Sequence, residues 1–93
     1  MNSFRYSAKV VLNEGDRIRV SGGPHFISQS GNKINMGEKG SGVFVRASED
    51  GQAIYVNFDN AQNTRYVYIG PQYTSKSTGT IMSPHKITKM RKK

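Results

Sequence analysis

A chain of 93 residues can close one small hydrophobic core and has little left for a second, so we expect a single domain. Its 14 lysines and arginines outnumber its 6 acidic residues, and a net charge of +8 attracts polyanions such as nucleic acid before any specific contact forms. The absence of cysteine excludes disulfides, thiolate nucleophiles and cysteine-ligated zinc.

The hydropathy pattern contains no targeting or membrane segment. The first six residues, Met1 to Tyr6, lack the apolar run of a signal peptide, and no stretch approaches the roughly 20 apolar residues of a membrane-spanning helix. The sequence also has no lipidation motif. We therefore expect a cytoplasmic protein that does not bind membranes.

Apolar and polar residues alternate with a period of two along much of the chain, which predicts a mostly β protein. A first extended segment, Tyr6–Leu12, ends at the turn residues Asn13-Glu14-Gly15. The next segment, Asp16–Val20, alternates so that its isoleucine and valine face the core, while Arg17 and Arg19 face outward.

The middle of the chain predicts a long loop followed by a meander. Residues 21–42 are rich in Gly, Ser, Asn and Pro, and we expect a small irregular hairpin around Ser30-Gly31-Asn32. Two β-rich runs, Ser41–Arg46 and Ala53–Phe58, flank a short Asp-Gly turn and predict a hairpin. A third run, Thr64–Ile69, extends it.

The last third of the chain contains a connector and the closing strand. Pro71–Gly79 reads as the connector, and Thr80–Met82 and Lys86–Met90 are the last strand candidates. We expect one β-barrel domain over residues 1–90 with a mobile N-terminus, and a basic C-terminal tail over residues 91–93.

This strand order resembles the small SH3-like barrels, including KOW and Tudor-type modules, from Glu14 to Met90. The resemblance is carried by the segments Gly15–Val20, Gly40–Val43, Val56–Asp59 and Ile87–Met90. It implies an all-β fold, a small SH3-like barrel of about five strands with a long first loop and an extra N-terminal strand. A five-stranded OB-fold is the competing architecture.

The outward face of the meander is expected to carry aromatic rings. The residues expected to point inward are Val43, Val45, Ile54, Val56, Val67 and Ile69. Those expected on the opposite face are Phe44, Arg46, Tyr55, Asn57, Tyr66 and Tyr68. The simplest hairpin register places Phe44 directly across from Tyr55.

Rings and cations on one face are the ingredients of a site for single-stranded nucleic acid. Bases stack on rings at roughly 1–3 kcal/mol each, and cations follow the phosphates. The predicted nucleic-acid-binding residues are Arg17, Arg19, Phe44, Arg46, Tyr55, Tyr66, Tyr68, Lys86, Lys89, Arg91, Lys92 and Lys93. DNA and RNA both offer phosphates and π-faces, so the sequence favours neither.

Two other functions remain open from the sequence. The ring-bearing face is also suited to contact the N-terminal strand, the long loop or a second copy, which favours a protein-interaction or homodimerisation module. The lysine-rich tail is then a solubilising terminus. A small RNA-cleaving toxin of similar barrel class is the third hypothesis.

Catalytic residues and cofactors are not expected, and we predict that the chain is not an enzyme. His25 and His85 each stand beside a proline with no evident nucleophile or orienting group. The acidic residues lie mainly at predicted turns and lack the close spacing of metal ligands. The glycine-rich segment Gly37–Gly42 does not end in the Gly-Lys-Ser/Thr of a phosphate-binding loop.

Overall fold

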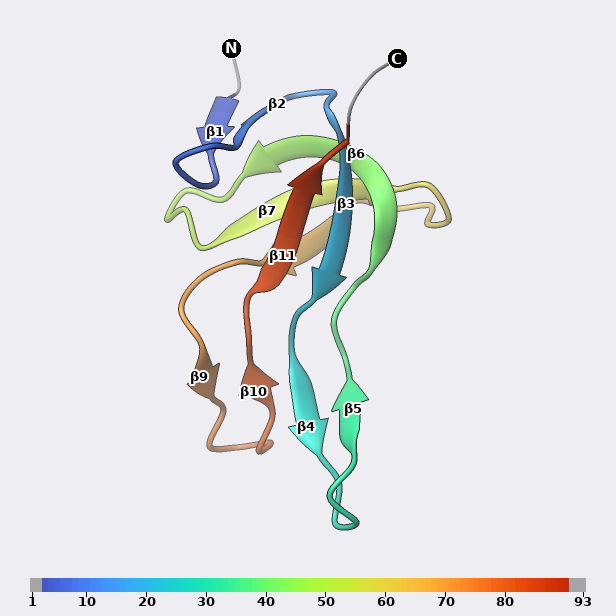
Figure 1. Ribbon diagram of the computed structural model, residues 1–93, viewed down its shortest axis with the longest axis vertical. Helices are drawn as coiled ribbons and strands as arrows, with labels where there is room; N and C mark the ends of the chain where they lie inside the picture. Colours follow the sequence, from blue (N-terminus) through green and yellow to red (C-terminus); the bar gives the residue numbers. More distant parts are fainter. Residues whose placement is uncertain (1–2, 91–93) are drawn as a thin grey trace.

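The computed structural model describes residues 3–90, and every regular element in this part of the chain is a strand (Figure 1). The strands are β1 (Ser3–Arg5), β2 (Val11–Asn13), β3 (Arg17–Gly22), β4 (His25–Ile27), β5 (Lys33–Asn35), β6 (Gly40–Ala47), β7 (Ala53–Phe58), β8 (Arg65–Tyr68), β9 (Tyr73–Thr74), β10 (Ile81–Met82) and β11 (His85–Lys89). No helix of the length and apolarity needed to span a bilayer occurs among these residues.

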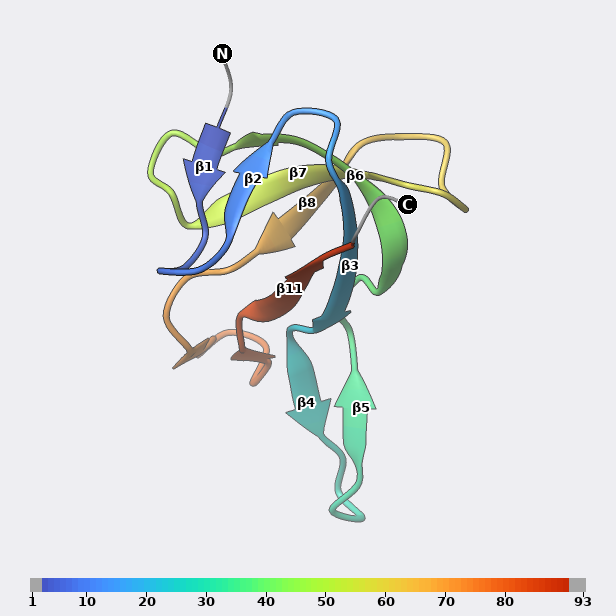
Figure 2. The same cartoon turned by 45° about the horizontal axis from the view of Figure 1, so that its top comes forward.

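The main body is a five-stranded antiparallel sheet in the order β11-β3-β6-β7-β8, and it curls around one core (Figures 1 and 2). The three runs of the predicted meander form β6, β7 and β8, one strand each. Turns at residues 48–51 and 59–64 reverse the chain between them, and apolar and polar side chains alternate along the strands. The predicted all-β, barrel-like architecture is confirmed.

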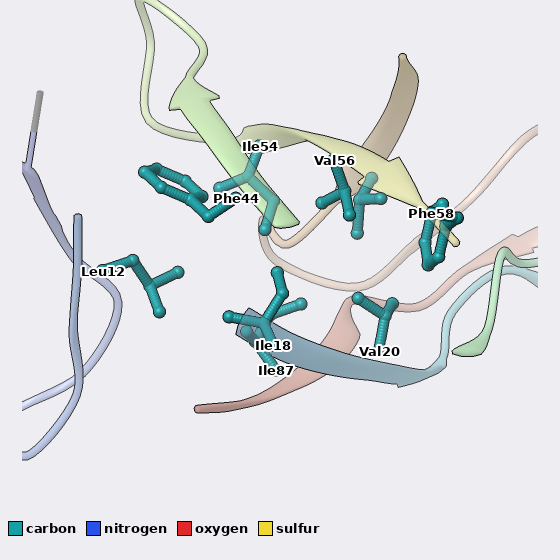
Figure 3. Packing of buried hydrophobic residues seen from close by; sticks show 9 residues of the cluster. Leu12, Ile18, Val20, Phe44, Ile54, Val56, Phe58 and Ile87 are labelled. Atoms are coloured by element: carbon teal, nitrogen blue, oxygen red, sulfur yellow. The ribbon is translucent and has the colours of Figure 1, made fainter. Parts of the chain in front are cut away.

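The core lies between the two halves of this curled sheet. Figure 3 shows side chains of β6 and β7 facing those of β3 and β11 across the interior. The fully enclosed residues are Leu12, Ile18, Val20, Phe44, Ile54, Val56, Phe58, Val67 and Ile87. Successive strand residues point to opposite sides, so each half of the sheet has one face toward the core and one face outward. The outward face of β3 and β11 therefore points away from the outward face of β7 and β8.

A β-bulge at Val45 changes which residues of β6 face the core. Phe44 pairs with Val56 and Arg46 with Tyr55, so Val45 is an extra residue on the β6 side. Phe44 therefore points inward and is only 1% exposed. The predicted register, with Val43 and Val45 inward and Phe44 outward opposite Tyr55, was wrong, because Val43 pairs with the outward residue Asn57 and Val45 lies in the bulge. Arg46 and Tyr55 face outward as expected.

The N-terminal segment forms a hairpin, β1 with β2, in place of the single strand expected over Tyr6–Leu12. Its Leu12 is fully buried in the core. The hydroxyl of Tyr6 accepts a hydrogen bond from the Ile87 N–H at 3.2 Å and donates one to the His85 carbonyl at 3.4 Å. This side chain therefore satisfies backbone groups on the outer edge of β11, where no strand of residues 3–90 pairs with it.

Two short hairpins form a second sheet, in the order β5-β4-β10-β9, at one end of the barrel (Figure 1). We call it the hairpin sheet. The expected irregular hairpin around Ser30-Gly31-Asn32 is confirmed as β4 and β5, and Gly31 takes a positive φ of 88° in its turn. The connector Pro71–Gly79 was predicted without structure, but it contains β9, which pairs with β10.

His85 joins three segments at the junction between the two sheets. Its Nδ1 is 2.8 Å from the Tyr68 carbonyl, and its Nε2 accepts the Glu38 N–H at 3.0 Å, so Nδ1 carries the proton. Glycine is required beside the ring, because a Cβ at Gly23 or Gly37 would lie 2.4 or 2.7 Å from Nε2. We call this arrangement the His85 clasp.

The His85 clasp predicts that the protein loses stability in mild acid. Burial lowers the pKa of His85 below its ordinary value of 6.5, and this outweighs the opposite effects of the Tyr68 carbonyl and the Glu38 charge. The unfolded chain therefore binds the proton more readily, so the contribution to stability is complete above pH 6.5 and is lost as the pH falls through the lowered pKa. We expect the melting temperature to fall as the pH drops from 6.5 through the lowered pKa of His85. This range lies above 3.8, the ordinary pKa of an aspartate carboxyl group.

Thermal unfolding followed by circular dichroism between about pH 8 and pH 4.5 measures this effect. In His85→Gln, which keeps one donor and one acceptor, this part of the pH dependence should disappear. NMR titration of the wild-type imidazole gives a second measurement that does not depend on a folded variant. A melting temperature that stays constant down to pH 5, with an imidazole pKa at or above 6.5, would contradict the prediction.

Candidate functional site

Outward side chains of β6, β7 and β8 form a compact group of rings and one cation. Tyr55 and Tyr66 are register partners, and their ring centroids lie 5.9 Å apart at 73°. The guanidinium carbon of Arg46 lies 4.4 Å from the centroid of Tyr55, within cation–π distance. Tyr68 shares the same face of β8. We call Arg46, Tyr55, Tyr66 and Tyr68 the ring platform.

Tyr73 extends the ring platform from the barrel onto the hairpin sheet. Its centroid lies 6.0 Å from that of Tyr68, with the two planes at 85°. The hydroxyl of Tyr68 donates to the Pro71 carbonyl, which fixes the ring beside the chain that leads to β9. Tyr73 was not among the site residues predicted from sequence, because it lies in a Ser/Thr-rich connector with no strand alternation. The one feature of the sequence that could have indicated Tyr73 is the presence of an aromatic residue in a polar segment.

Burial and neighbouring groups raise the pKa of two platform tyrosines. Burial is the largest cause for both Tyr66 and Tyr68, and the carboxylate of Asp50 and the neighbouring rings add to it. Asp50 lies in the β6–β7 turn, where its Oδ1 accepts hydrogen bonds from the Ser48 hydroxyl and the Gln52 N–H. The negative charge of Asp50 is therefore close enough to act on the hydroxyls of Tyr66 and Tyr68.

Arg17 is held in an ion pair. Its two terminal nitrogens each lie 2.7 Å from one carboxyl oxygen of Asp59, and the guanidinium holds the pKa of that carboxyl below its ordinary value. Both side chains are exposed, so the pair contributes little to stability. Arg17 would have to leave Asp59, or share its charge with it, to contact a phosphate.

The other predicted cations within residues 3–90, Arg19, Lys86 and Lys89, lie away from the ring platform. Arg19 pairs with Thr88, and Lys86 with Ser21, on the outward face of β3 and β11. That face points away from β7 and β8, so the single site predicted from sequence is divided between two sides of the barrel. Lys89 lies at the end of the barrel, where its ammonium contacts the Val11 carbonyl and the Asp16 carboxylate, each at 3.1 Å.

Three predicted site residues lie outside the described part of the chain, and a fourth belongs to the core. Arg91, Lys92 and Lys93 follow the last described residue, Met90. Phe44 is enclosed in the barrel and is not available to a ligand. The predicted residues that the structure brings together are therefore Arg46, Tyr55, Tyr66 and Tyr68.

Neither histidine is one of the residues of the ring platform. His85 is engaged in the His85 clasp, and His25 lies on the hairpin sheet opposite Ile81. Within residues 3–90 no group of three or more His, Asp or Glu side chains is arranged to hold a metal ion. The ring platform brings accessible aromatic rings and a cation together on one face of the barrel.

The electrostatic part of this geometry is testable by alkaline titration. The substitution Asp50→Asn removes the negative charge but keeps an oxygen that can accept the hydrogen bonds from the Ser48 hydroxyl and the Gln52 N–H. In this variant the pKa values of Tyr66 and Tyr68 should fall toward 10. Tyrosinate absorbance measures the shift, and Glu49→Gln, which removes the neighbouring charge, is the matched control. Identical titrations of Asp50→Asn and wild type would place Asp50 away from the rings.

No protein-family model, curated protein or solved structure matches this chain. The support for a function therefore comes from the geometry and charge of the chain's own residues.

Proposed function

We propose that the protein is a noncatalytic nucleic-acid-binding module and that the ring platform is its binding surface. The observation that carries this proposal is the contact of Arg46 with Tyr55, beside Tyr66, which is 56% exposed. A stacking surface and a cation are thus side by side on one accessible face. Proteins that bind single strands use this combination, because bases stack on the rings while cations neutralise phosphates.

The charge of the chain supports the same function. A net charge of +8 creates a field that concentrates polyanions near the molecule, and it makes their binding sensitive to salt. The local charges also suggest an orientation. Phosphates should lie toward Arg46 and away from the carboxylate of Asp50, with the bases over the rings.

Fluorescence anisotropy with single- and double-stranded DNA and RNA, at two salt concentrations, tests the proposal. Tyr66→Ala should weaken binding by roughly 5- to 150-fold, which corresponds to the loss of one stacked base. Arg46→Ala should weaken binding and also flatten the dependence of log K on log salt, because one phosphate contact is removed.

Two controls separate the ring platform from general electrostatic attraction. Ile27→Ala removes an exposed apolar side chain from another part of the surface and should bind as wild type does. A chain ending at Met90 lacks three basic residues, so it should lose affinity mainly at low salt. Unchanged binding by Tyr66→Ala, or no binding of any nucleic acid at low salt, would refute the proposal. RNA shortened on a denaturing gel would favour the toxin hypothesis.

A second candidate function, a protein-interaction or homodimer module, is favoured by exposed apolar residues on the hairpin sheet. Ile34 is 41% exposed and Met36 is 55% exposed. The hydroxyl of Thr80 lies 3.9 Å from the Met36 sulfur. Exposed clusters of this kind often mark protein interfaces.

Size-exclusion chromatography with light scattering tests this candidate. An apolar interface should give a dimer that persists at high salt, and the double substitution Ile34→Ser with Met36→Ser should convert it to a monomer. Lys33→Ser, on the neighbouring exposed position, is the matched control. A monomer at every concentration and salt would argue against the homodimer.

A further inference from the structure

The three rings of the platform, together with Tyr73, form two similar pairs. Tyr66 is 56% exposed and meets Tyr55 edge to face, and Tyr73 is 53% exposed and meets Tyr68 edge to face. In each pair the second ring is more buried and holds the exposed ring in place. In an edge-to-face pair the two rings do not stack on each other, so at most one face of each ring is directed at its partner. Tyr66 and Tyr73 thus each keep a ring face that the partner ring does not cover.

We propose that Tyr66 and Tyr73 are two stacking positions for successive parts of one single strand, which crosses from the barrel to the hairpin sheet. This inference rests on the proposed nucleic-acid-binding function and extends it by naming a second binding residue and the single-stranded class of ligand.

The two positions are close enough to serve one ligand. Tyr68 is in ring contact with Tyr73, and it lies two residues from Tyr66 on the same face of β8. Consistently, Tyr73 contributes to the raised pKa of both Tyr66 and Tyr68. The platform is thus continuous from β7 to β9.

Cations lie at both ends of this ring series. Arg46 lies over Tyr55 at the barrel end, and Lys76 is exposed in the turn that follows β9 at the other end. A strand that stacks on the rings between them can place phosphates near both. Duplex nucleic acid is less suited, because its bases are paired and stacked inside and cannot reach the rings.

Quenching of intrinsic tyrosine fluorescence measures this binding without a dye that could itself stack. The chain has no tryptophan, and four of its five tyrosines, all except Tyr6, belong to this ring series. Oligothymidylates of about 2, 4, 8 and 12 nucleotides cover the site sizes of single-strand binders. With the longer oligonucleotides, Tyr73→Ala should weaken binding roughly 5- to 150-fold. With the dinucleotide it should have little effect, because a short ligand can occupy the Tyr66 position alone.

Matched variants test whether the Tyr73 ring itself is required. Tyr73→Phe retains the ring and should bind as wild type does. Ile27 lies on the opposite face of the hairpin sheet, so Ile27→Ala should also leave binding unchanged. Circular dichroism of each variant establishes that the fold is intact.

The possible failures are distinguishable. If Tyr66→Ala weakens binding but Tyr73→Ala does not at any length, the second stacking position is refuted and the proposed function stands. If Tyr73→Ala weakens duplex binding as much as single-strand binding, the single-stranded class is wrong. If no oligonucleotide binds wild type, the proposed function itself fails. If Tyr73→Ala changes only the mass in light scattering, the ring belongs to an interface between copies.

Discussion

The imidazole of His85 connects parts of the chain that strand pairing leaves separate. β8 and β11 are the two edges of the five-stranded sheet, and the bond from Nδ1 of His85 to the Tyr68 carbonyl bridges them. Its Nε2 fixes the segment before β6 through the Glu38 N–H. A buried imidazole with both nitrogens satisfied allows only one arrangement of these segments, because an unpaired nitrogen would cost the desolvation energy of that group.

The same contact determines where the rings lie. His85 holds the backbone of Tyr68, and the side chain of Tyr68 in turn contacts Tyr73. β11 follows β10 after only two residues, so the strand that carries His85 also positions the hairpin to which β9 belongs. The distance between the two exposed rings is therefore set by the packing at the junction of the sheets, and not by the surface residues alone.

The limits of sequence analysis are visible at Phe44 and Tyr73. The meander was predictable, because apolar residues alternate in β7 and β8 and an Asp-Gly turn precedes β7. Val43, Phe44 and Val45 are all apolar, so alternation gives no sign of which residue a bulge will leave unpaired. Tyr73 belongs to a two-residue strand that exists because β10 pairs with it, and such tertiary pairing leaves no periodic signal.

In the proposed binding function, the positive charges and the rings have different roles. Arg19 and Lys86 lie on the outward face of β3 and β11, away from the ring platform, and Arg17 is paired with Asp59. Charges in these positions add to the long-range field, which raises the rate of encounter with a polyanion and does not orient it. Orientation must come from short-range contacts, and Arg46 is the cation in direct contact with a platform ring. Selectivity for unpaired bases would therefore arise from the ring platform, whereas sensitivity to salt would arise from Arg46 together with the more distant cations.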